Sequence, residues 1–249
     1  ILNNKRSGTG GIFNKVLLFV TIFFCCLLLT PEKHCSSQAI EKQERPLVTN
    51  IPSVNRLFVG RLEHLTKLRE KLKTEETSGI IPIVGMAGMG KTQLAKQYAH
   101  AHANDYDVIW WVDANQDLLS QIRELGLELR SLQGCAMPEP QERAVTTWSQ
   151  AIDLCQKQRS TKMLLVIDDV KDKEFAKPIS QTIKSIHLLL TSRNQLMGEN
   201  VMCLKCFTSE ESIEYLNKML PEHSYDREGL NKLRETLHDY PLALAQASS

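Results

Sequence analysis

The chain has 249 residues, of which 30 are basic and 29 acidic, so its formal net charge is +1. A balance this close to zero excludes a global electrostatic field that would recruit nucleic acid or an acidic surface, and any phosphate binding has to be local. The seven cysteines are an odd number scattered over a long chain, which is not the pattern of a disulfide framework. The length suits one large domain with a smaller appendage.

The first feature along the chain is an uncharged apolar run of 14 residues, Val16 to Leu29. Basic residues precede it and Pro31 follows it, as in a signal peptide with a small-residue cleavage site at residues 37–39. The run is shorter than the roughly 20 residues that span a bilayer, although a short anchor with snorkelling flanks remains an alternative. We therefore expect residues 1–30 to be a signal or anchor segment.

The next segment, 31–56, is polar and contains three prolines, so we expect a linker. From residue 79 short apolar runs alternate with helical patterns, which is typical of a doubly wound α/β domain, and we expect this domain over 57–206. Five parallel strands are expected at 80–84, 108–112, 163–168, 187–191 and 201–204. Helices are expected at 91–102, 118–132, 146–158 and 174–182. A capping box at Thr208–Glu211 then opens a stretch without strands, which predicts the start of a small, incomplete helical subdomain at 207–249.

The stretch Gly85 to Thr92, GMAGMGKT, matches the phosphate-binding loop G-x-x-x-x-G-K-[ST] and lies between a strand and a helix, the context that this motif requires. Its backbone amides can close around phosphates at the helix N-terminus, where the helix dipole favours anions. Lys91 would neutralise β- and γ-phosphate oxygens, and the Thr92 hydroxyl would reach Mg²⁺. Pro82, in the preceding strand, removes a ladder hydrogen bond and indicates where that strand begins to pair. The residues expected to contact the nucleotide here are Gly85, Gly88, Met89, Gly90, Lys91, Thr92 and Gln93.

Two further strands end in polar residues. MLLVIDDV carries Asp168 and Asp169 at its carboxyl end, where a Walker B aspartate leaves a parallel sheet. Asp168 would hold Mg²⁺ and Asp169 would orient or deprotonate the attacking water, whereas a turn cap is the alternative for such a pair. Arg193, in HLLLTSRN, could bind a γ-phosphate in a bidentate manner or be an ordinary solvated charge, and spacing alone does not decide between these. No guanine-binding motif follows, so we expect an adenine nucleotide.

The motifs FVGRLEHLTKL, GMAGMGKT, LLVIDD, LLLTSR and YPLALAQA follow one another in this order. The ordered set resembles the NB-ARC family of STAND ATPases, which includes plant disease-resistance proteins, the apoptotic protease-activating factor and bacterial relatives with repeat sensors. The resemblance covers residues 57–249. It implies a P-loop NTPase fold in which the LLLTSR strand lies between the strands that lead to Lys91 and to Asp168.

The resemblance also implies roles for residues outside the phosphate loop. Phe58, Val59 and Arg61 would pack against the adenine and contact the nucleotide from the N-terminal side. Arg193 would be the sensor arginine that distinguishes ATP from ADP, and Pro241 would close over the adenine. Two positions depart from the family pattern. Leu62 stands where the family often has glutamate, and the residues before Pro241 lack the usual glycine, so the adenine contacts are expected to differ while the phosphate site is intact.

Motifs and resemblance together predict an ADP/ATP-binding module that uses Mg²⁺ and acts as a nucleotide-dependent signalling switch. It would be a weak ATPase at most, with Lys91, Asp169 and Arg193 as catalytic residues and Thr92 and Asp168 at the metal. We expect protein partners or self-association on activation, and no nucleic acid. Two alternatives stay open: an AAA-type motor ATPase with sustained turnover, and a membrane-tethered or truncated interaction protein without catalysis.

The charge distribution around the apolar run bears on location. Its positive N-terminal flank would by itself place the chain after residue 30 outside the cytosol. An ATP-dependent domain would lack its ligand there. We therefore expect membrane association through Val16 to Leu29 with the nucleotide domain facing the cytosol, and the orientation of the segment stays open.

Overall fold

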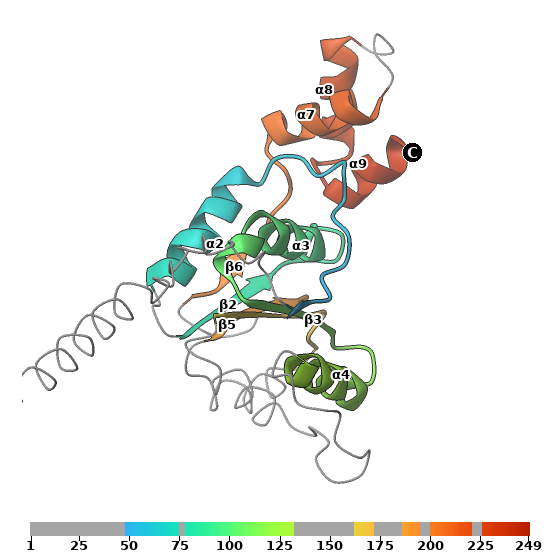
Figure 1. The fold of residues 1–249 in the computed structure, drawn as a ribbon. Coiled ribbons are helices and arrows are strands. Elements are labelled where there is room, and N and C mark those ends of the chain that lie inside the picture. The colour runs from blue at the N-terminus through green and yellow to red at the C-terminus, as the bar shows by residue number, and fades with distance from the viewer. Residues whose placement is uncertain (1–47, 75–77, 132–161, 172–185, 195–199, 221–225) are drawn as a thin grey trace, which may run out of the picture. The chain divides into compact units, whose positions relative to one another are not determined.

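The centre of the fold is a parallel sheet (Figure 1). A computed structural model describes residues 48–74, 78–131, 162–171, 186–194, 200–220 and 226–249, all of which belong to one compact unit spanning residues 44–249. Among them, six strands pair in the order β1-β3-β4-β5-β2-β6. The strands are β1 (Val48–Thr49), β2 (Ser78–Val84), β3 (Val108–Asp113), β4 (Met163–Asp168), β5 (Ile186–Ser192) and β6 (Met202–Cys203). All pairs are parallel, and β5 lies between β2 and β4 as the resemblance implied.

The sheet has one strand more than the five that we predicted. This strand, β1, lies inside segment 31–56, which was expected to be a linker, and it pairs with β3. The side chain of Asn50 extends the pairing, because its amide donates to the Trp111 carbonyl (2.9 Å) and its oxygen accepts from the Trp111 N–H (2.6 Å). Two residues are too few to show the alternation that predicts a strand, so the sequence pattern misses it.

Pro82 lies inside β2, and the prediction that strand pairing begins there is correct on only one side of the strand. On one side β2 pairs with β5 from Ser78 onward, four residues before the proline, so the prediction that pairing begins at Pro82 is wrong there. On the other side β6 pairs only with Ile83 and Val84, directly after the proline. A strand tolerates proline where one side lacks a paired neighbour, and β6 leaves β2 unpaired up to this point.

Helices cover both faces of the sheet. The described helices are α2 (Leu62–Thr74), α3 (Lys91–Ala101), the short 3-10 helix η1 (Ala103–Asp105), α4 (Leu118–Ser131), α7 (Ser209–Met219), α8 (Arg227–Thr236) and α9 (Pro241–Ala247). Figure 1 shows α2 and α3 on one face and α4 on the other. Because successive strand residues point to opposite faces, Trp110 packs into the core under α4 and Trp111 into the core under α2 and α3. Burying such a side chain contributes roughly 1.5–3 kcal/mol, so both faces of the sheet are tied to their helices.

Two of the predicted helices, 91–102 and 118–132, are confirmed as α3 and α4. The predicted helices 146–158 and 174–182 lie outside the described residues. The apolar run Val16 to Leu29 also lies outside them. Within the part of the chain that the structure describes, no helix has the length and apolar character needed to cross a bilayer.

In the described parts of residues 207–249, three helices follow the sheet, and each begins with a recognisable signal. The predicted capping box at α7 is present: the Thr208 hydroxyl accepts from the Glu211 N–H, and the Glu211 carboxylate accepts from the Thr208 N–H. Asp226 caps α8 and Pro241 occupies the first turn of α9, where a missing N–H costs no hydrogen bond. These helices share a core with a residue that precedes α2, namely Val59 with Tyr215, Leu216, Leu230 and Leu244. The predicted boundaries between the segments stay predictions.

Candidate functional site

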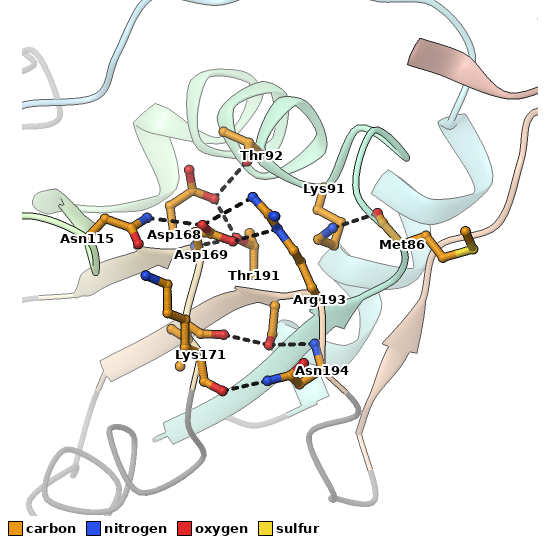
Figure 2. Close-up of polar contacts among 12 residues, drawn as sticks. Met86, Lys91, Thr92, Asn115, Asp168, Asp169, Lys171, Thr191, Arg193 and Asn194 are labelled. Atoms are coloured by element: carbon orange, nitrogen blue, oxygen red, sulfur yellow. Dashed lines mark hydrogen bonds and ion pairs between the residues drawn. The ribbon is translucent and has the colours of Figure 1, made fainter. Parts of the chain in front are cut away.

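The loops after β2, β4 and β5 meet at the carboxyl edge of the sheet (Figure 2), where open parallel sheets bind their ligands. The loop after β2 leads directly into α3, whose N-cap is Gly90. Gly88 and Gly90 have φ values of +74° and +87°, a backbone conformation that glycine adopts without steric cost. The loop therefore turns back on itself and directs the N-terminus of α3 at its own interior.

Lys91 is the first residue of α3, and its ammonium lies within this loop. Its Nζ donates to the Gly85 and Met86 carbonyls at 2.8 Å each (Figure 2). The side chain is buried, and this burial, reinforced by the charge of Arg193, lowers the pKa of Lys91. A bound anion would act in the opposite direction, because it stabilises the charged ammonium.

Asp168, at the end of β4, is held by two hydroxyls. Thr92, from α3, donates to its Oδ1 at 2.8 Å, and Thr191, from β5, donates to the same oxygen at 2.5 Å. Thr191 is 1% exposed, so its hydroxyl is fixed in the sheet. Three elements therefore converge on one carboxylate.

These groups fit a magnesium ion. Carboxylate and hydroxyl oxygens are hard donors, and Mg²⁺ in phosphate sites usually binds one or two protein groups while phosphates and water complete its shell. In the described ranges no cluster of three His, Cys, Asp or Glu side chains forms a complete protein cage. Thr92 and Asp168 would therefore hold the ion together with a nucleotide and not alone.

Asp169 adopts a left-handed backbone conformation, with φ of +58°, and its side chain faces Arg193 (Figure 2). The Arg193 Nε lies 3.3 Å from Asp169 Oδ1, and the Asn115 amide donates to Asp169 Oδ2 at 3.0 Å. The Asp169 N–H donates to the Thr191 hydroxyl at 2.9 Å, which fixes the backbone of Asp169 against β5. The Arg193 side chain is 63% exposed, and its guanidinium nevertheless pairs with the Asp169 carboxylate in the site.

A cleft of about 530 Å³ joins these residues to an apolar region between the sheet and the helices that follow it. Its charged end holds the phosphate loop and the side chains around Asp168 and Asp169. Its apolar end is formed by Leu57, Phe58, Val59, Phe207, Tyr215, Pro241 and Ala245, and Leu242 lines the cleft beside Gly88 of the phosphate loop. All predicted site residues except Gly85 line the cleft: Phe58, Val59, Arg61, Gly88, Met89, Gly90, Lys91, Thr92, Gln93, Asp168, Asp169, Arg193 and Pro241. Their individual roles stay predictions.

Arg61 lines the cleft, but its guanidinium bonds to protein carbonyls. It donates to Lys205 O at 2.7 Å and, more weakly, to Met89 O at 3.4 Å. The guanidinium also lies 4.7 Å from the centre of the Phe207 ring. Burial lowers the pKa of Arg61, and the nearby Glu211 carboxylate partly offsets this. In this arrangement Arg61 joins the phosphate loop to the segment that follows β6.

Two glycines of the site leave room for neighbouring elements. A Cβ on Gly88 would lie 2.7 Å from the Tyr240 hydroxyl and 2.7 Å from Leu242 Cβ, and the Tyr240 hydroxyl donates to the Ala87 carbonyl. A Cβ on Gly85 would lie 2.6 Å from the Leu204 carbonyl. The residues before Pro241, where the chain departs from the family pattern, therefore rest directly on the phosphate loop.

Sequence reasoning missed four residues of this arrangement. Thr191 and Asn115 hold the two aspartates, Tyr240 contacts the phosphate loop, and Glu211 contacts Arg61. Thr191 could have been found from its place in LLLTSR next to the strand that carries Asp168. The other three contacts join segments that no local pattern relates.

A family model described as the NB-ARC domain matches residues 61–225, which include the phosphate loop and both strands with polar ends. The chain belongs to the NB-ARC family. Among its relatives, the probable disease resistance protein RF45 of Arabidopsis thaliana is 32% identical over 169 residues, and this match covers 62% of the chain and 16% of that protein. The probable disease resistance protein RXW24L of the same plant is 28% identical over 199 residues, covering 76% of the chain and 22% of that protein. The NB-ARC chain thus spans about a sixth to a fifth of these relatives.

Solved structures support the fold. A STAND protein with a tetratricopeptide repeat sensor from Pyrococcus horikoshii superposes with a TM-score of 0.52 at 23% identity, over 78% of this chain and 30% of that one. A Walker-type ATPase of Pyrococcus abyssi superposes with a TM-score of 0.56 at 14% identity, over 79% of this chain and 69% of that one. The NB-ARC chain is therefore a P-loop NTPase in fold, and membership of the family makes it a nucleotide-binding module.

Proposed function

We propose that this NB-ARC chain binds ADP and ATP with Mg²⁺, acts as a nucleotide-dependent signalling switch and hydrolyses ATP slowly at most. One observation carries the proposal: a single cleft has a charged end at the phosphate loop and an apolar end beside Phe58, Val59 and Pro241. A nucleotide needs both environments at opposite ends, because its base is planar and largely apolar and its phosphates are anionic. The family's nucleotide binding and the cleft's polarity point to the same ligand.

In the proposed complex, Lys91 and the amides of the phosphate loop hold the β- and γ-phosphates. Thr92 and Asp168 hold Mg²⁺, which would neutralise charge on the phosphate oxygens. Asp169 orients or deprotonates the attacking water. Arg193 senses the γ-phosphate.

The pairing of Arg193 with Asp169 supports a switch more than a fast enzyme. Arg193 already has a carboxylate partner at 3.3 Å, so a γ-phosphate has to compete with Asp169 for the guanidinium. ADP has no γ-phosphate and leaves the pair intact. While Asp169 is bound by Arg193 and by Asn115, its carboxylate oxygens are less available to an attacking water, which favours slow hydrolysis.

Signalling and partners are inferred from the relatives. The two Arabidopsis thaliana relatives are named probable disease resistance proteins, and the NB-ARC chain covers 16–22% of their length. We propose that, as part of such a protein, a change of nucleotide alters contacts with protein partners or promotes self-association.

The nature of the bound nucleotide tests the proposal directly. The purified chain is denatured and the released small molecules are separated and identified. We expect stoichiometric adenine nucleotide, mostly ADP, because the product accumulates when its release is even slower than hydrolysis. A chain that releases no adenine nucleotide, and that binds none when ATP and Mg²⁺ are added, would contradict the proposal.

The rate of turnover distinguishes the switch from an AAA-type motor. We expect phosphate release far slower than about 10 s⁻¹, a typical enzyme turnover number, with ADP remaining bound between turnovers. Sustained turnover near that rate without bound ADP would favour the motor. The control is Asp169→Asn, which should remove the remaining turnover without removing bound nucleotide.

A further inference from the structure

The segment 58–61, of which Phe58 and Val59 line the apolar end of the cleft, lies along α7. At one end of the segment the Lys218 ammonium donates to the Phe58 carbonyl at 3.2 Å. At the other end the Arg61 N–H donates to Glu211 Oε1 at 2.6 Å. Lys218 and Glu211 are seven residues apart, two turns along the same face of the helix. The segment is therefore held to α7 at both ends.

Glu211 uses its two carboxylate oxygens for two different purposes. Its Oε2 accepts from the Thr208 N–H at 2.9 Å and so completes the cap of α7. Its Oε1 accepts from the Arg61 N–H, and the carboxylate lies 3.8 Å from the Arg61 guanidinium. The side chain is 16% exposed, so water competes little for these contacts. Only the first purpose is visible in the sequence.

The backbone of segment 58–61 is shaped to fit this carboxylate. Gly60 and Arg61 both adopt the left-handed conformation, with φ of +65° and +59°, which a non-glycine residue such as Arg61 adopts only when its surroundings require it. A Cβ on Gly60 would lie 2.6 Å from Glu211 Cγ. The turn therefore brings the Arg61 N–H to Glu211 and leaves no space between them.

Arg61 carries the contact onward to the phosphate loop. Its guanidinium donates to the Met89 carbonyl, inside the loop, and to the Lys205 carbonyl, ahead of α7. Its Nε is buried without a hydrogen-bond partner, so the guanidinium is positioned by the bonds of its two terminal nitrogens to backbone carbonyls. A displacement of Glu211 would move both Phe58, at the base end, and Arg61, at the phosphate end.

We propose that Glu211 is a positioning residue for nucleotide binding: it fixes segment 58–61 on α7 so that the base and phosphate ends of the cleft keep their spacing. The inference rests on the proposed function, because it assigns the apolar end of the cleft to the base. Glu211 touches no nucleotide in this scheme. It acts through Arg61 and through the peptide groups of segment 58–61.

The test separates positioning from helix capping with two variants of the same capping box. Glu211→Gln leaves one acceptor oxygen for two N–H groups, so it weakens either the cap or the contact with Arg61. Thr208→Ala removes the other half of the cap and does not touch segment 58–61. Dissociation of a fluorescent ADP analogue from the 249-residue chain is followed by stopped flow, and the thermal midpoint without added nucleotide is measured alongside.

We expect Glu211→Gln to speed ADP dissociation about tenfold, the loss of one hydrogen bond to a charged group, whereas Thr208→Ala changes the rate less than about twofold. Both variants should lower the thermal midpoint.

Because Glu211→Gln could also impair folding, Lys218→Met provides a second probe. Lys218 is exposed, so the thermal midpoint of this variant should not change. ADP dissociation should be about two- to threefold faster, and Lys218→Arg should restore the original rate.

Two outcomes overturn the inference. In the first, Glu211→Gln and Thr208→Ala speed ADP dissociation to the same extent for the same decrease in thermal midpoint. The other is a Lys218→Met variant that releases ADP at the unsubstituted rate. A wild-type chain that retains no ADP analogue would instead overturn the proposed function and this inference with it.

Discussion

Replacing Lys91 with alanine should weaken binding of both ADP and ATP by at least about 100-fold, because two charge-assisted hydrogen bonds to phosphate, each of about 1.5–3 kcal/mol, are lost together. The ammonium already lies inside the loop, where it donates to the Gly85 and Met86 carbonyls. The effect should be equal for the two nucleotides if Lys91 acts mainly at the β-phosphate, and larger for ATP if it acts at the γ-phosphate.

The measurement is a titration with fluorescent ADP and ATP analogues, with circular dichroism to verify the fold. Lys96→Ala is the matched control. It removes the same charge from the same helix, but its ammonium lies 5.9 Å from the centre of the Trp111 ring and not at the loop. Unchanged affinity in Lys91→Ala would show that the loop does not carry phosphates in this chain.

Replacing Arg193 with glutamine should reduce the preference for ATP over ADP. We expect ATP to bind about tenfold more weakly and ADP to bind within about twofold of wild type, which is the lower range for a charge-assisted contact because the side chain is exposed and screened by solvent. The existing partner also limits the effect: in the wild type the γ-phosphate has to displace Asp169, which lies 3.3 Å from the Arg193 Nε.

A double-mutant cycle with Asp169→Asn measures that competition. The single Asp169→Asn variant should bind ATP a few-fold more tightly, because Arg193 is then available to the γ-phosphate, while its hydrolysis should fall by about 10²–10⁴-fold if Asp169 is the general base. Lys171→Gln is the control, since it removes an exposed positive charge close by. If Arg193→Gln alters ADP and ATP binding equally, Arg193 does not sense the γ-phosphate.

The sheet and the phosphate site could be predicted because their signals are local. A buried strand, a glycine-rich loop and a lysine at the start of a helix are adjacent in sequence, so pattern alone places Lys91 and Thr92 at the sheet edge. The position of β5 between β2 and β4 was not local, and only the family resemblance supplied it. With that order known, Arg193 falls beside Asp169, 3.3 Å from its carboxylate, and its role at the γ-phosphate stays a prediction.

The features that sequence reasoning missed have physical causes in common. β1 has two residues and shows no periodicity. Where pairing begins at Pro82 depends on how far the neighbouring strand β6 extends. The capping role of Glu211 can be predicted from the four-residue motif Thr208–Glu211, but its contact with Arg61 joins positions 150 residues apart. Arg61 lines the cleft and its contact with the nucleotide stays a prediction, while its guanidinium bonds to carbonyls of the protein, because a buried charge without such partners would be costly.

The glycines of the phosphate loop have a consequence for how such loops evolve. Gly88 is constrained by the Tyr240 hydroxyl and Leu242, and Gly85 by the Leu204 carbonyl, and none of these contacts is with a phosphate. A descendant of this chain that no longer used ATP would still lose packing if either glycine gained a side chain, so purifying selection on the fold alone would preserve both. In such lineages, retained glycines would reflect the packing of the fold. Whether Lys91 and Asp169 are retained would be the better indicator of nucleotide chemistry.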